Sequence, residues 1–153
     1  MSDYERLLIE AYKGELLGEA TFSAMATRAE YRDHRGTLDV LAQIEARTAA
    51  TLQPLLRAAN VDPGDVEEPR RLGRELAAAG GSWDGFVKAL GDALPKFLAD
   101  FLRLREAAAD PHHPALTALV AHEQAIAALA QLEVGGYHDV STTVLTRYLE
   151  TAP

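Results

Sequence analysis

Residues 116–130 read LTALVAHEQAIAALA, a stretch in which apolar residues recur every three or four positions. The recurring residues are Leu116, Leu119, Ile126 and Ala130, and Glu123 takes the remaining place in the series. This spacing places all five on one face of an α-helix. The stretch therefore predicts a buried helix with a single carboxylate on its inward face.

The rest of the chain has the same kind of composition. The sequence contains 28 Ala and 22 Leu, about a third of its 153 residues, and both are strong helix formers. No segment alternates apolar and polar residues as a strand would, and the Gly and Pro residues gather at a few breaks. The sequence predicts an all-α protein that forms a single domain over residues 1–153.

The breaks divide the chain into long and short helices. Long helices are expected at about residues 4–31, 37–59, 82–109 and 114–134. A short helix is expected near residues 70–79 and another after Gly136, packed across one end. The first and third long helices are each followed by a short turn, whereas about 23 residues follow the second and can run back along the bundle as a crossover. Pro54 and Pro95 are expected to kink or split their helices.

The net charge and the amino-acid composition exclude several classes of function. With 15 Lys+Arg against 23 Asp+Glu, the net charge of −8 argues against a nucleic-acid partner. The absence of Cys excludes disulfides and thiolate metal sites. No signal peptide, membrane-spanning window, or nucleotide or flavin signature is visible, so a cytoplasmic protein with no membrane partner is expected.

Each long helix carries at least one carboxylate on its expected inward face. The first has Glu15 and Glu19, the second Glu45, the third Asp100 and the fourth Glu123. A buried ionised carboxylate costs several kcal/mol unless it is paired, protonated or bound to a cation. Carboxylates around a bundle axis suit divalent iron or manganese. The alternative is that each carboxylate lies at the edge of its apolar stripe with its head in water.

Four long helices, a long connection after the second and one inward carboxylate per helix resemble the ferritin-like superfamily of di-iron and di-manganese carboxylate proteins. The resemblance covers roughly residues 4–134. It implies a ferritin-like four-helix bundle with a long crossover and a short fifth helix at the C-terminus. In that family the first and third helices each give a Glu, and the second and fourth each give Glu-x-x-His. The implied metal ligands are Glu19, with Glu15 as second choice, then Glu45, Asp100 and Glu123.

The chain departs from the family at both histidines. The two motifs read EART from Glu45 and EQAI from Glu123. His122 is adjacent to Glu123 but about 100° round the helix, so it reaches the site only if that helix is rotated or distorted. What remains is an oxygen-rich site that holds one metal ion, holds manganese or magnesium weakly, or is vestigial.

Two functions are consistent with these features. The first is a metal-binding bundle, with iron or manganese, that acts as a small metal-dependent oxidoreductase. The second is a non-catalytic scaffold or binding module, expected to be a homodimer, that has lost its metal centre. Inward carboxylates that converge within about 4 Å of a common point would favour the first.

Overall fold

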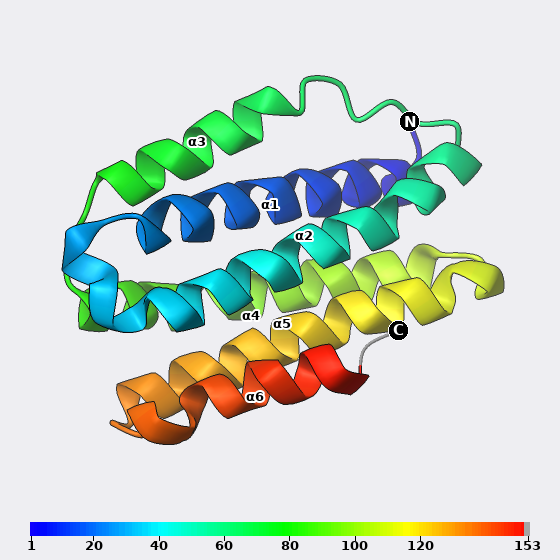
Figure 1. Ribbon diagram of the computed structural model, residues 1–153. Coiled ribbons are helices and arrows are strands. Elements are labelled where there is room, and N and C mark those ends of the chain that lie inside the picture. The colour runs from blue at the N-terminus through cyan, green and yellow to red at the C-terminus, as the bar shows by residue number, and fades with distance from the viewer. Residues whose placement is uncertain (152–153) are drawn as a thin grey trace.

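The computed structural model describes residues 1–151, which form six α-helices and no β-strand (Figure 1). The all-α prediction is confirmed. The four long helices are α1 (Asp3–Ala26), α2 (Arg35–Ala58), α4 (Trp83–Ala107) and α5 (His113–Val134), and the two shorter ones are α3 (Glu67–Ala78) and α6 (His138–Thr151). Short 3₁₀ helices, Ala29–His34 and Asp110–His112, form the turns after α1 and α4.

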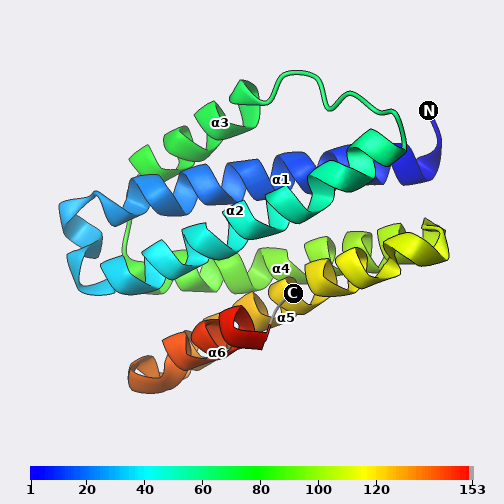
Figure 2. The ribbon, with the colours of Figure 1, turned by 45° about the vertical axis from the view of Figure 1, so that its right-hand side comes forward.

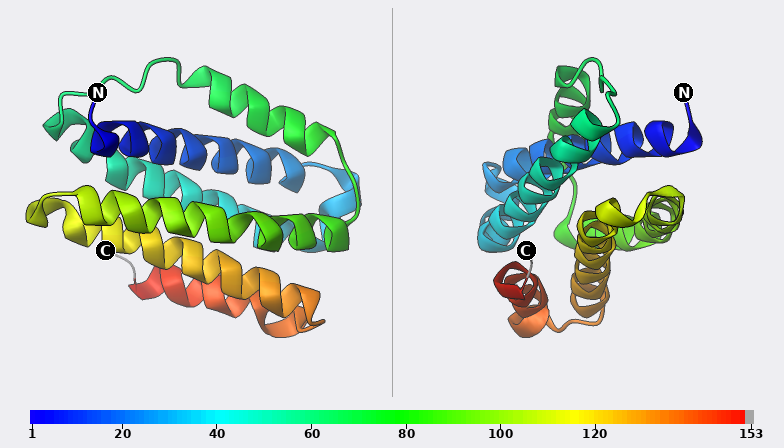
Figure 3. Two further views of the ribbon diagram at one scale, coloured as in Figure 1. Left: turned by 180° about the vertical axis from the view of Figure 1, so that it is seen from behind. Right: turned by 90° about the vertical axis from the view of Figure 1, so that its right-hand side faces the viewer.

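The long helices form two antiparallel pairs that lie in two layers, α1 with α2 and α4 with α5 (Figure 3). The connection from α2 to α4 runs back along the bundle, and α3 within it packs beside α1 (Figures 1 and 2). As a result, α2 and α4 run in the same direction. The contact between α3 and α1 depends on Gly73, where a Cβ atom would lie 2.5 Å from the Leu17 carbonyl oxygen.

Two apolar clusters fill the bundle, one towards each end. One contains Phe22, Leu38 and Ile126, and the other contains Leu8, Leu52 and Leu119. On α1, α2 and α5 the change from one cluster to the other falls next to a buried ionisable residue. The core is therefore interrupted by a polar layer midway along the bundle, which is described below.

The helix α5 is the most apolar of the long helices. The stretch Asp110–Val134 is the one candidate among residues 1–151 that is long and apolar enough to cross a membrane. Half of its most apolar window is buried inside the bundle.

Three details differ from the expectations. The helix α1 ends at Ala26, and the following residues form the 3₁₀ turn, which buries Tyr31. Of the two outcomes expected at Pro54 and Pro95, a kink or a split, the split does not occur, because α2 and α4 each continue through the proline. The last helix, α6, lies alongside α5 and does not cross the end of the bundle, because it buries Leu145 against the core (Figure 1).

A buried carboxylate, Glu133, joins three of the helices at one end. The Trp83 indole N–H at the start of α4 donates to Glu133 over 2.9 Å. From the start of α6, the Ser141 hydroxyl donates to the other carboxylate oxygen, and the His138 ring Nδ1 lies against the first. The His34 ring stacks on Trp83 with 4.0 Å between centroids. Glu133 is therefore a hydrogen-bonded anchor for α4, α5 and α6.

Candidate metal centre

The polar layer holds three side chains from three helices: Glu15 of α1, Glu45 of α2 and His122 of α5. One ligand atom from each of them lies within 4.8 Å of the other two. Their exposed fractions are 2%, 7% and 0%. These three residues are called the cluster below. Carboxylate and imidazole side chains that are this deeply buried and this close together are typical of a metal centre.

A backbone hydrogen bond sets the direction of the His122 ring. Its Nδ1 lies at the Leu119 carbonyl oxygen one turn earlier, and because a carbonyl only accepts, Nδ1 carries the proton. In the neutral ring Nε2 then presents a lone pair. That atom faces Glu15 Oε2 at 3.1 Å and Glu123 Oε2 at 3.4 Å. The Phe101 ring of α4 lies beside the imidazole, with 5.9 Å between centroids.

Two buried atoms of the cluster have no hydrogen-bond partner among residues 1–151: Glu15 Oε2 and His122 Nε2. They lie 3.1 Å apart, but their geometry does not meet the requirements of a hydrogen bond. Two acceptors that face each other in this way need a proton or a metal cation between or beside them. Two ligands about 2.1 Å from one metal ion, at a right angle, would themselves be about 3.0 Å apart. The separation therefore fits two ligands of a single ion.

Burial makes the carboxylates of this layer hold their protons. It raises the pKa of Glu15 to about 8, an effect partly offset by a hydrogen bond with Glu45 and increased by the Glu123 charge. Burial, with the neighbouring Glu15 carboxylate, also raises the pKa of Glu45 well above its usual range. Burial raises the pKa of Glu123 to about 7, although His122 opposes this. A metal cation would displace these protons and remove the repulsion between the carboxylates.

A glycine on α1 makes room for one of the carboxylates. A Cβ atom on Gly18 would lie 2.8 Å from Glu45 Cδ and 2.9 Å from its Oε2. Gly18 is one helical turn beyond Glu15, so the missing side chain lets the Glu45 carboxylate come close to α1 beside Glu15. The bundle interior therefore has room for the Glu45 carboxylate between α1 and α2.

The helix α6 covers the cluster on another side through Tyr148. The Tyr148 hydroxyl donates to the Ala118 carbonyl over 3.3 Å. Burial raises the pKa of Tyr148; a hydrogen bond with Thr48 and the charge of Arg47 oppose this rise, and the charges of Glu15 and Glu45 add to it. Thr48, at the place of the family's histidine on the second helix, is also buried, and its hydroxyl donates to the Ile44 carbonyl over 2.9 Å.

The structure brings together some of the residues expected as ligands and separates others. Glu15, Glu45 and His122 form the cluster, and Glu123 borders it. Glu19 instead lines a surface cavity of about 380 Å³ between α1 and α3, beside Arg70. Glu15, which precedes it by one turn, takes the inward position.

Asp100 also lies outside the cluster. Its carboxylate forms ion pairs with Lys96 at 3.1 Å and Arg103 at 3.6 Å on its own helix. The adjacent residue, Phe101, is buried and contacts His122 instead. At this point α4 therefore turns Phe101, and not Asp100, towards the cluster, and gives it an aromatic wall without a carboxylate.

The sequence pattern did not indicate Gly18, Phe101 or Tyr148 as parts of the site. Gly18 carried a weak signal, because a glycine inside a long helix is unfavourable unless close packing requires it. Comparisons with known proteins add no assignment: no protein-family model, no curated protein and no solved structure matches the chain. The fold and the site define an all-helical bundle with a buried carboxylate–histidine cluster that could hold a metal ion.

Proposed function

We propose that this protein is a metal-binding helical bundle of the ferritin-like kind, which holds Fe(II) or Mn(II) at the cluster. The observation that carries the proposal is the pair of buried, unpartnered atoms, Glu15 Oε2 and His122 Nε2, which face each other at 3.1 Å. The order of its helices, two antiparallel pairs joined by a long crossover, supports the relationship to the ferritin-like superfamily.

The donor set favours these two metals. Glu15, Glu45 and His122 offer two carboxylates and one imidazole, and Glu123 is near enough to add a third carboxylate. A set of hard oxygen ligands with a single nitrogen suits manganese and iron better than it suits copper or zinc, which prefer softer ligands. Bound iron or manganese would supply Lewis-acid and one-electron redox chemistry, which makes a small oxidoreductase the expected class of activity.

The side chains around the ligands prepare the site. The Leu119 carbonyl fixes the His122 ring with Nε2 towards the carboxylates, and the missing side chain at Gly18 lets Glu45 approach. Phe101 shields the imidazole on the α4 side. Since Glu15 and Glu123 hold protons near neutral pH, metal binding is expected to release them to solvent.

The decisive experiment compares two pairs of variants. Metal content and the melting temperature are measured after anaerobic addition of Fe(II) or Mn(II) to the wild type, Glu15→Gln and Glu45→Gln. The matched controls are Glu19→Gln and Asp100→Asn, which remove carboxylates outside the cluster. We expect one ion per chain and a higher melting temperature. When the free metal concentration is 100 times Kd, binding should raise the free energy of unfolding by about 2.7 kcal/mol. Both effects should disappear in the first pair and remain in the second.

Proton release gives a second readout. Calorimetric titration with Mn(II) at pH 7, in buffers of different ionisation enthalpy, should detect about two protons released per ion, because Glu15 and Glu45 both hold protons at this pH. A wild type that binds neither metal, or control variants that lose as much metal as the cluster variants, would contradict the proposal.

A second candidate function is a non-catalytic scaffold in which protons take the place of a metal. The hydrogen bond between Glu15 and Glu45 favours it, because one shared proton neutralises part of the pair. Three apolar side chains near the α5–α6 turn, Val134, Tyr137 and Val140, are exposed and would be covered in a homodimer. Light scattering of the metal-free protein tests this candidate: a concentration-dependent dimer that Tyr137→Ser abolishes would support it.

A further inference from the structure

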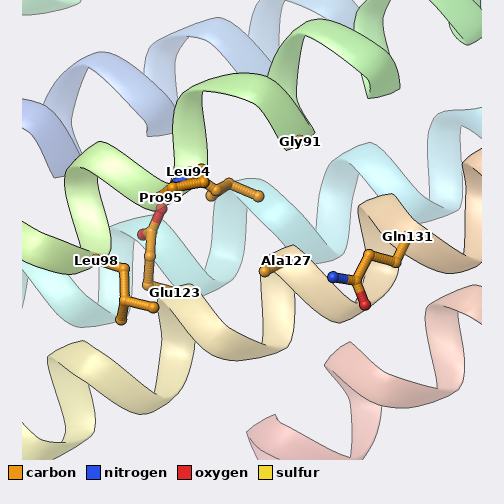
Figure 4. A pocket seen from close by; sticks show the side chains of 7 residues that line it. All are labelled: Gly91, Leu94, Pro95, Leu98, Glu123, Ala127 and Gln131. Carbon is orange, nitrogen blue, oxygen red and sulfur yellow. The ribbon is translucent and has the colours of Figure 1, made fainter.

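A cavity of about 230 Å³ lies between α4 and α5 and reaches the carboxyl group of Glu123 (Figure 4). Its walls include the apolar side chains of Leu94, Leu98 and Ala127. A cavity of about 150 Å³ is enough to hold benzene, so this space fits a single ring with a short substituent. The cavity differs from the cluster in being open to a ligand from outside the bundle.

The polar groups at this cavity are mainly acceptors. The Glu123 side chain extends from α5 towards α4 near Leu94 and Pro95 (Figure 4). Since Glu123 Oε2 is the oxygen that faces His122, its other oxygen remains for a ligand. Gly91 also lines the cavity, and its carbonyl lacks its usual helical donor, because Pro95 four residues later has no N–H.

The charges indicate the sign of the ligand. None of the seven lining residues is positively charged, and the net charge of the chain is −8. The remaining polar group, the Gln131 amide, can accept as well as donate. A carboxylate ligand would face Glu123 without a cation to pair with it. An ammonium group has three donors and no acceptor, so it matches a carboxylate and a free carbonyl.

We propose that the cavity between α4 and α5 binds a small primary amine as its ammonium ion. The ammonium group donates to the Glu123 carboxylate and the Gly91 carbonyl, and the hydrocarbon body lies against Leu94, Leu98 and Ala127. This binding requires no metal in the cluster, so it can be tested independently of the proposed metal function.

The test uses benzylamine as the probe on metal-free protein in the presence of a chelator, at about pH 8, where Glu123 is ionised and the amine is an ammonium ion. Benzyl alcohol and benzoate serve as neutral and anionic probes of nearly the same shape. Affinity is measured by calorimetry, and the position of the ligand by amide chemical shifts of Gly91, Leu98 and Ala127. We expect benzylamine to bind at least about tenfold more tightly than benzyl alcohol, with no binding of benzoate.

Two variants test the charge of Glu123 and the volume of the cavity separately. Glu123→Gln keeps the size of the side chain and should weaken benzylamine binding about tenfold. Ala127→Leu fills the cavity without changing charge and should abolish binding. The matched control, Glu106→Gln, removes an exposed carboxylate near the end of α4 and should leave the affinity unchanged. The amide spectrum of each variant verifies that it is folded.

Three results would overturn the proposal. They are benzoate or benzyl alcohol binding as tightly as benzylamine, unchanged benzylamine affinity in folded Glu123→Gln, and no benzylamine binding at about 10 mM. A protein that binds benzylamine but no Fe(II) or Mn(II) would contradict the metal function alone. A protein that binds metal but no benzylamine would contradict only the amine site.

Discussion

Glu133 and the cluster are two buried acidic centres in one bundle, and their surroundings have opposite effects. Burial opposes ionisation of Glu133, yet hydrogen bonds from Ser141, Trp83 and His138 lower its pKa below the usual value. In the cluster, burial raises the pKa of Glu15 to about 8, and its Oε2 has no hydrogen-bond donor. The comparison teaches that the number of hydrogen-bond donors around a buried carboxylate matters more than how deeply it is buried. A carboxylate with donors stabilises the fold, whereas one without them is left to bind a cation.

The largest expected difference between the two centres is in their response to pH. The pKa of Glu15 rises from 4.5 to about 8 on folding, so its contribution to stability is fully present below pH 4.5 and is lost as the pH rises through 8. Each carboxyl of this kind changes the free energy of unfolding by about 1.4 kcal/mol per pH unit. We expect Glu15 alone to cost the metal-free protein about 4 kcal/mol between pH 5 and pH 8, and Glu45 and Glu123 to add to this loss.

Urea unfolding with a chelator, at half-unit steps of pH, measures this loss. Glu133 has the opposite sign: its contribution is present above its unfolded pKa, near 4.5, and is lost as the pH falls through its lowered folded pKa. Glu15→Gln, compared with the wild type at each pH, isolates the contribution of Glu15. Stability that stays constant or rises from pH 5 to pH 8 would contradict the comparison.

Removal of the Glu133 carboxylate tests the anchor directly. Glu133→Ala leaves the Trp83 indole N–H without its acceptor and the Ser141 hydroxyl with only the His138 carbonyl, and the free energy of unfolding should fall by about 3 kcal/mol. The loss should be the same with and without Mn(II). Glu150→Ala, at an exposed position on α6, is the control and should change stability by less than about 0.5 kcal/mol.

The equivalent change in the cluster should have the opposite sign. Glu15→Gln removes a charge that has no hydrogen-bond donor at Oε2, so at pH 8 the metal-free protein should gain about 2 kcal/mol of stability. Chemical denaturation at this pH measures the gain. If Glu15→Gln destabilises as much as Glu133→Ala does, the two centres are alike and the comparison fails.

The smallest expected effect concerns the space around Glu45. Gly18→Ala places a Cβ atom 2.8 Å from Glu45 Cδ, so the carboxylate must move, and Mn(II) affinity should fall about tenfold, or about 1.4 kcal/mol. Gly14→Ala is a matched control on the same helix, because its Cβ meets nothing within 4 Å. That variant should keep its metal affinity and gain up to about 1 kcal/mol of stability. Calorimetric titration of both variants measures the difference, and equal affinities would show that Gly18 makes no room for a ligand.

Much of the helical pattern could be predicted from spacing alone. The stripes of α2 and α5 predicted buried positions for Glu45 and Glu123, and both are buried. In α4 two series run one residue apart, one with Phe97 and Asp100 and the other with Leu94 and Phe101. Only the packing against α5 selects the second, which leaves Phe97 exposed.

The ligand set was harder to predict because it depends on how α5 is rotated. Its apolar residues extend round much of its circumference, since α4, α2 and α6 all pack against it. The helix can therefore bury both His122 and Glu123, although they lie about 100° apart. On α1 the same uncertainty applied to Glu15 and Glu19, one turn apart, and the position of α2 favours Glu15. Sequence spacing identifies the face of a helix but does not determine its rotation in the bundle.

The separation of the cluster residues along the chain has a consequence during synthesis. Glu15 and Glu45 belong to the first helical pair, whereas His122 is 107 residues beyond Glu15. At about 5–20 residues per second, a ribosome completes α5 roughly 5–20 s after α1. Until then the two glutamates lie on a nascent hairpin, where water solvates them. Their desolvation coincides with the docking of α5, so the rate of that last folding step should depend on the protons or metal ions available at that moment.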